Sequence, residues 1–72
     1  MPSQRQRPIR YRFVVRGRLS HHLASAFEGL ELDWLQGDSS LTGPIVDQAH
    51  LQGVLDRLRD LGIPLVSVNP VE

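Results

Sequence analysis

Residues 47–64 read DQAHLQGVLDRLRDLGIP, and this stretch predicts one complete helix with both ends defined. Apolar residues recur there at i, i+3, i+4, i+7 and i+10, which aligns them on one stripe of a helix with about 3.6 residues per turn: Leu51, Val54, Leu55, Leu58 and Leu61. Asp47 suits the N-cap because its carboxylate accepts from free N–H groups of the first turn. Gly62 suits the left-handed position after the last turn, and Pro64 prevents continuation. One helix cannot bury its own stripe, so the rest of the chain must supply the opposing surface.

The chain has 72 residues, which is enough for one small domain. Because a chain of this length buries only about 60% of the surface that its unfolded form exposes, its stability is marginal. It contains no cysteine, so neither a disulfide nor a thiolate metal site can stabilise it. Small domains of this kind often gain stability by association, and we therefore expect a homodimer.

The apolar runs of the sequence are short. The longest cannot cross a bilayer, and the N-terminal residues contain no apolar segment of the kind that directs secretion. We therefore expect a cytoplasmic protein without membrane contact.

Charge is unevenly distributed, although the formal net charge is zero with neutral histidines. The arginines of the first part of the chain all precede the first acidic residue, Glu28: Arg5, Arg7, Arg10, Arg12, Arg16 and Arg18. Residues 1–8, MPSQRQRP, have no apolar pattern, and we expect them to form a flexible basic arm. One end of the chain is basic and the remainder is acidic.

Residues 9–15 alternate between two faces, as in a half-buried strand. One face carries Ile9, Tyr11, Phe13 and Val15, and the other carries Arg10, Arg12, Val14 and the following Arg16. Ser20 can cap a short helix over residues 21–28, which ends at Gly29 and has the inward stripe Leu23, Ala24 and Phe27.

Three further strands are expected. Residues 30–35, LELDWL, alternate again, and residues 36–39 supply the turn of a hairpin. Residues 41–46 predict the next strand, in which Pro44 must face away from the ladder or mark a bulge. Residues 65–68 predict the last strand, so the domain spans residues 9–69 and residues 70–72 form a tail. The expected core consists of Leu51, Val54, Leu55, Leu58, Phe13, Leu32, Trp34 and Phe27.

The order of elements is β, α, β, β, α, β, which predicts an α+β fold of the ferredoxin-like type. In this fold a four-stranded antiparallel sheet carries two helices on one face, with the strands in the spatial order four, one, three, two. The first strand is then central, and its arginines lie on the face that no helix covers.

Two stretches carry a resemblance to a known family: VRGRL at residues 15–19 and DQAHLQGVLDRLRDLGIPLVSV at residues 47–68. They resemble short bacterial proteins with the pattern V-x-G-x-L followed by D-Q-A-x-L-x-G-x-L-x-R-L-x-x-L-G-x-x-L-x-x-V, mostly unassigned in function. The resemblance brings no catalytic residues with it. At the level of fold alone the order also resembles regulatory ACT domains.

The uncovered sheet face is the main candidate site. It combines apolar side chains with charges of both signs, a mixture that suits association between proteins. Arg10 or Arg12 of one copy could pair with Glu31 or Asp33 of another across a two-fold axis. The edge strands offer strand addition as a second route. The predicted interface residues are Arg10, Arg12, Val14, Arg16, Glu31, Asp33, Leu35 and Leu65.

Arg16, Arg18 and Ser20 form a possible anion site at the start of the first helix. An ordinary N-cap beside two solvated arginines explains the same residues, and we prefer that interpretation.

The sequence favours neither a metal site nor catalysis. His21, His22 and His50 are the obvious metal ligands, but the two predicted helix starts lie at opposite ends of the sheet, and adjacent histidines diverge by about 100° on a helix. No motif with a known catalytic mechanism occurs. We therefore expect no cofactor, no metal and no enzymatic activity.

Two alternatives to self-association remain open. The N-terminal arginines could follow a nucleic-acid backbone, although the uncovered face lacks the aromatic residues on which bases stack and carries Glu31 and Asp33, which repel phosphate. The resemblance to ACT domains implies a small-ligand sensor with a pocket at a dimer seam.

Overall fold

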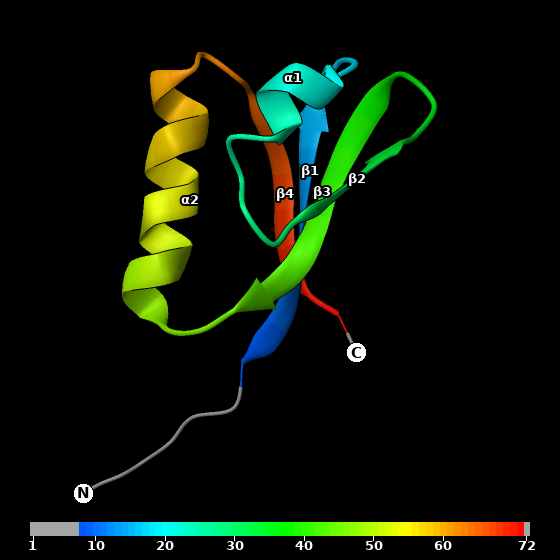
Figure 1. The fold of residues 1–72 in the computed structure, drawn as a ribbon. Coiled ribbons are helices and arrows are strands. Elements are labelled where there is room, and N and C mark those ends of the chain that lie inside the picture. The colour runs from blue at the N-terminus through cyan, green and yellow to red at the C-terminus, as the bar shows by residue number, and fades with distance from the viewer. Residues whose placement is uncertain (1–7, 72) are drawn as a thin grey trace, which may run out of the picture.

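The computed structural model describes residues 8–71, which contain four strands and two helices. In chain order these are β1 (Ile9–Arg16), α1 (His21–Ala24), β2 (Glu31–Trp34), β3 (Asp38–Ile45), α2 (Gln48–Asp60) and β4 (Leu65–Pro70). The strands form one antiparallel sheet in the order β2-β3-β1-β4, and both helices lie on one side of it (Figure 1). The predicted α+β, ferredoxin-like fold is confirmed. Apart from Pro8, the predicted N-terminal arm lies outside the described residues.

The register of the sheet determines which side chains share a face. β1 and β3 pair without interruption from Ile9 opposite Ile45 to Arg16 opposite Asp38. β4 pairs with β1 from Pro70 opposite Tyr11, but its register shifts between Val14 and Val15. Directly opposed residues of an antiparallel pair point to the same face, and neighbours along a strand point to opposite faces.

Both predicted ends of α2 are confirmed. The Asp47 carboxylate accepts from the His50 N–H at 2.8 Å, as an N-cap does. At the other end Gly62 has a φ of 72°, its N–H donates to Arg59 O, and the Ile63 N–H donates to Leu58 O. This pair of bonds is the Schellman motif, which satisfies carbonyls of the last turn. Neither helix of residues 8–71 is long and apolar enough to cross a membrane.

α1 is shorter than the helix predicted over residues 21–28. After one turn capped by Ser20, the Ala26 and Phe27 N–H groups donate to carbonyls three residues back instead of four. The Ser25 hydroxyl also donates to the His22 carbonyl at 2.6 Å, which is the local bonding by which serine competes with helical structure. The chain therefore leaves the helix as a series of turns that still buries Phe27.

Two strands differ from their predicted bounds: β3 at its start and β4 at its end. β3 begins at Asp38 instead of residue 41, because Gly37, with a φ of 80°, allows a tighter loop than predicted. β4 continues to Pro70, so the predicted tail starts too early, and the Val71 N–H still donates to Arg10 O at 2.7 Å. That bond directs the polar backbone groups of Arg10 towards β4. Pro44, opposite Arg10, therefore turns its nitrogen away from β1, and its missing N–H costs no bond to that strand.

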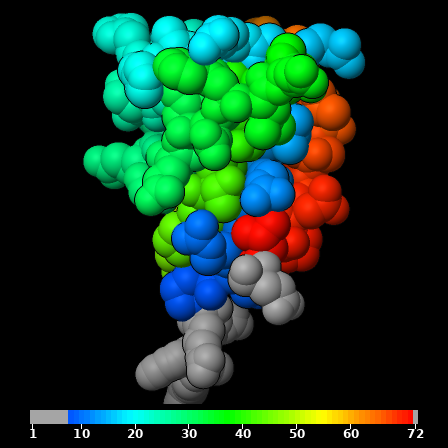
Figure 2. All heavy atoms as spheres, turned by 90° about the vertical axis from the view of Figure 1, so that its right-hand side faces the viewer, coloured from blue at the N-terminus to red at the C-terminus, as the bar shows by residue number. Residues whose placement is uncertain are grey.

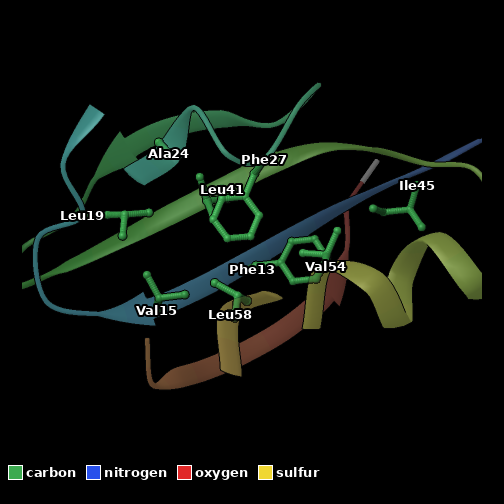
Figure 3. Packing of buried hydrophobic residues seen from close by; sticks show 9 residues of the cluster. All are labelled: Phe13, Val15, Leu19, Ala24, Phe27, Leu41, Ile45, Val54 and Leu58. Atoms are coloured by element: carbon green, nitrogen blue, oxygen red, sulfur yellow. The ribbon is translucent and has the colours of Figure 1, made fainter. Parts of the chain in front are cut away.

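The core lies between the sheet and α2 and under the segment that follows α1 (Figure 3). Its buried apolar residues are Phe13, Val15, Leu19, Ala24, Phe27, Leu41, Ile45, Val54 and Leu58. Of the predicted core, Leu32, Leu51 and Leu55 are partly buried and pack against this cluster. Leu23, predicted to face inward, is 37% exposed.

The sequence predicts Trp34 in the core, but 40% of it is exposed. It lies on the helix side, opposite Ser39, where the single turn of α1 does not cover it. Instead the Arg18 guanidinium stacks over its ring at 4.5 Å, and the His21 ring meets it edge-on at 5.0 Å. Its Nε1 donates to the Leu19 carbonyl at 2.9 Å. Trp34 therefore anchors the loop after β1.

Candidate interface on the open face of the sheet

The face of the sheet opposite the helices, called the open face below, contains side chains from every strand. Figure 2 looks onto it, with the blue atoms of β1 between the green of β3 and the orange and red of β4. Phe13 and Val15 are fully buried on the helix side, so the residues that alternate with them point outward. The register aligns two full rows across β2, β3, β1 and β4: Asp33, Ser40, Val14, Ser67 and Glu31, Thr42, Arg12, Asn69.

Charge on the open face is divided between strands. β1 carries Arg10, Arg12 and Arg16, whereas the edge strand β2 carries Glu31 and Asp33. β3 lies between them, so the arginines are about 10 Å from the acids measured from strand to strand. Within residues 8–71 the only ion pair joins Arg59 to Asp56 on α2. The basic and acidic stripes of the open face are therefore both available to an external partner.

Leu65 is not on the open face, contrary to the sequence prediction. It lies opposite Val15, whose side chain is buried, and it borders a cleft with Leu55, Leu58 and Ile63. The cause is the register shift in β4: Ser67 pairs with Val14 and Leu65 with Val15, so Val66 is an extra residue. One extra residue in a strand reverses the face of every residue beyond it.

The loss of Leu65 leaves the open face more polar than expected. Val14 is half-buried, and Leu35, which follows β2 and is 47% exposed, donates its N–H to Asp38 O at 2.8 Å. Between the charged stripes Ser40 is 3% exposed and Thr42 is half-buried. A partner would thus meet small polar side chains and, at the start of β3, Asp38 at the centre, charges at the sides and one exposed leucine at an end.

Both edges of the sheet are protected against strand addition. β2 is four residues long and carries two acids, and β4 contains a bulge and ends at Pro70, which has no N–H. Charges, short length, bulges and proline are the features by which native edge strands avoid pairing with other chains. The open face is therefore the more accessible surface for association.

The structure does not bring the residues of the predicted anion site together. The Ser20 hydroxyl accepts from the Leu23 N–H at 3.1 Å and is occupied as a cap. Arg18 stacks over Trp34 on the helix side, whereas Arg16 points to the open face. The three side chains therefore do not converge on one anion.

The histidines have local structural contacts. His50 Nδ1 accepts from the Val46 N–H at 3.0 Å, next to the cap of α2, and His21 packs against Trp34. In the part of the chain that the structure describes, no three His, Cys, Asp or Glu side chains are grouped as metal ligands would be.

A groove that the sequence did not indicate runs between α2 and residues 25–30. It has a volume of about 470 Å³, and His50, Gly53 and Arg57 of α2 form one wall. These residues follow helical spacing on the side of α2 next to its apolar stripe. The wall opposite α2 consists of residues that follow α1, which stops after one turn, a feature that the sequence pattern did not predict.

Comparison with known proteins gives a family but no characterised relative. The family model described as Domain of unknown function (DUF8691) matches residues 10–69, a span that includes both stretches on which the sequence resemblance rests. No curated protein and no solved structure matches the chain. Since the family model covers most of the sequence, the chain belongs to the DUF8691 family.

Proposed function

We propose that this protein is a small non-catalytic interaction module that self-associates through the open face of its sheet. The observation that carries the proposal is the division of charge on that face. Arg10, Arg12 and Arg16 lie on β1, Glu31 and Asp33 lie on β2, and β3 keeps them apart within one chain. A surface with separated stripes of opposite charge is complementary to itself, which favours a second copy as the partner.

Because both edge strands are protected, association through the open face is favoured over strand addition. Because Leu65 lies on the other face, the apolar contribution that the register places on the open face comes mainly from Val14 and Leu35. The charges therefore supply much of the specificity, and we expect the dimer to weaken as salt is added.

Solution mass by light scattering tests the proposal on the full chain. Leu35→Lys places a charge on the open face and should shift the protein to monomer. Leu61→Lys is the matched control: Leu61 has a similar exposure, 44% against 47% for Leu35, but lies at the end of α2. Its dimer should persist. A wild type that stays monomeric, or a dimer that loses stability only with Leu61→Lys, contradicts the proposal.

Nucleic-acid binding through the arginines is the main alternative, and salt does not separate it from self-association. Glu31→Arg does. If the open face follows a phosphate backbone, this substitution removes repulsion and strengthens binding to a single-stranded oligonucleotide. If the face binds a second copy, the same substitution weakens the dimer and produces no oligonucleotide binding.

The ligand-sensor alternative is less well supported. It requires a pocket at a dimer seam, but the groove beside α2 lies on the opposite side of the sheet from the seam proposed here. Three expectations from the sequence remain predictions: the pattern shared with short bacterial proteins, the similarity to ACT domains and the cytoplasmic location. Fractionation of cells that express the tagged full chain tests the location.

A further inference from the structure

This inference rests on the proposed self-association and specifies its geometry. We infer that two copies pack open face to open face about a two-fold axis that runs parallel to the strands above β3, so that β1 of each copy lies against β2 of the other.

Two symmetric arrangements bring the open faces together with β3 at the centre. If the axis lies in the interface and perpendicular to the strands, each strand meets its own copy. Arg10, Arg12 and Arg16 then face the same arginines, and Glu31 and Asp33 face the same acids. Like charges in direct opposition disfavour association, so this arrangement is excluded.

An axis parallel to the strands reverses the order of the strands and keeps their position along the strand direction. Because β2 and β1 are both neighbours of β3, each lies over the other in the second copy. Glu31 and Arg12 belong to the same row of the sheet, since both pair with Thr42. Arg12 of one copy therefore lies against Glu31 of the other, and the symmetry repeats this contact.

The small residues of β3 permit this approach. Ser40 and Thr42 lie on the axis, and their short side chains leave room for two sheets at the usual separation of about 10 Å. Asp38 also lies near the axis, where it meets its own copy. Arg16 lies opposite Asp38 on β1 of each chain, so the charges at that end balance.

The two Arg12–Glu31 contacts make a charge exchange the decisive test. Arg12→Glu and Glu31→Arg each replace both contacts with like charges, and each variant alone should dimerise roughly tenfold or more weakly than the wild type. A mixture of the two variants should form a heterodimer, because both of its contacts then join opposite charges. The double variant should also regain the dimer. Both positions are exposed, and circular dichroism verifies that the variants remain folded.

Arg57→Glu serves as the matched control, because Arg57 is an exposed arginine on α2, away from the open face. It should leave dimerisation unchanged. If Leu35→Lys abolishes the dimer but the mixed variants fail to restore it, the open face is the interface and the inferred axis is wrong. If neither Leu35→Lys nor the charge variants change the mass, the proposed function fails as well. Restoration by mixing Arg12→Glu with the wild type to the same extent would favour the excluded axis.

Discussion

Ser39 links the start of β3 to the loop after β1. Its side chain is fully buried; the hydroxyl accepts from the Leu19 N–H at 2.8 Å and donates to the Gly17 carbonyl at 2.7 Å. Serine is typical of turns, but Ser39 lies in a strand, where its hydroxyl bonds the backbone groups of Leu19 and Gly17, which are distant in the sequence. Sequence patterns describe neighbours along the chain and contain no information about such contacts.

Ser39→Ala should lower the free energy of unfolding by about 1–3 kcal/mol, because it leaves the buried Leu19 N–H without an acceptor. Urea denaturation measures the change. Ser40→Ala is the control: Ser40 is 3% exposed, and it takes no part in the two hydrogen bonds that join Ser39 to Leu19 and Gly17. An equal loss in both variants would show that burial alone, and not the hydrogen bonds, explains the effect.

Leu65 illustrates which residue positions the sequence could not predict. Alternation along an unbroken β4 would place Leu65 opposite Arg16 on the open face, as expected from the sequence. The extra residue Val66 moves it opposite Val15, and the side chain changes face. Nothing in the letters LVSV marks a bulge, because no glycine or proline occurs within them.

At the scale of single elements, α2 contains a glycine that the fold does not require. A Cβ atom at Gly53 would meet no atom within 4 Å. Gly53→Ala should therefore raise the free energy of unfolding by about 0.5–1 kcal/mol through helix propensity. Gly62→Ala should lower it by about 1 kcal/mol, since Gly62 has a φ of 72°. Urea denaturation of both variants checks the prediction, and a loss with Gly53→Ala would point to a crowded site.

Asp56, on α2, makes the free energy of unfolding depend on pH. The pKa of its carboxyl group is lowered because Gln52 Nε2 donates to it at 3.2 Å and Arg59 donates at 2.7 Å. Because the folded state prefers the ionised form, this stabilisation is present above the unfolded pKa and disappears as the pH falls through the folded one. The difference in unfolding free energy between wild type and Asp56→Ala should be constant from about pH 5 to 7 and shrink below about pH 4. A difference independent of pH would contradict this assignment.

The elements with a complete local pattern were predicted well. α2 combines an apolar stripe, an N-cap and a terminal glycine, and β1 alternates without interruption, so both agree with their predicted bounds within a few residues. α1 has a cap but only a short stripe, and the Ser25 side chain competes with its second turn. Residues after this early end line the groove beside α2, so the groove could not be predicted either.

At the scale of the whole molecule, the net charge is zero, but the charged side chains are unevenly distributed. The sheet separates an apolar core on the helix side from a polar face on which β1 is basic and β2 is acidic. The strand order could be predicted from the order of elements. It is this order that places β3 between the two stripes and keeps the acids of β2 apart from the arginines of β1 within one chain.

Amide chemical shifts of the full chain, followed by ¹⁵N NMR through a dilution series at low salt, test the central claim most directly. We predict concentration-dependent shifts for the open-face strands, above all at Arg12, Val14, Glu31 and Thr42, and none for the outer side of α2. Shifts that are absent at all concentrations, or that concentrate on α1 and α2 instead, would show that the open face is not the surface of self-association.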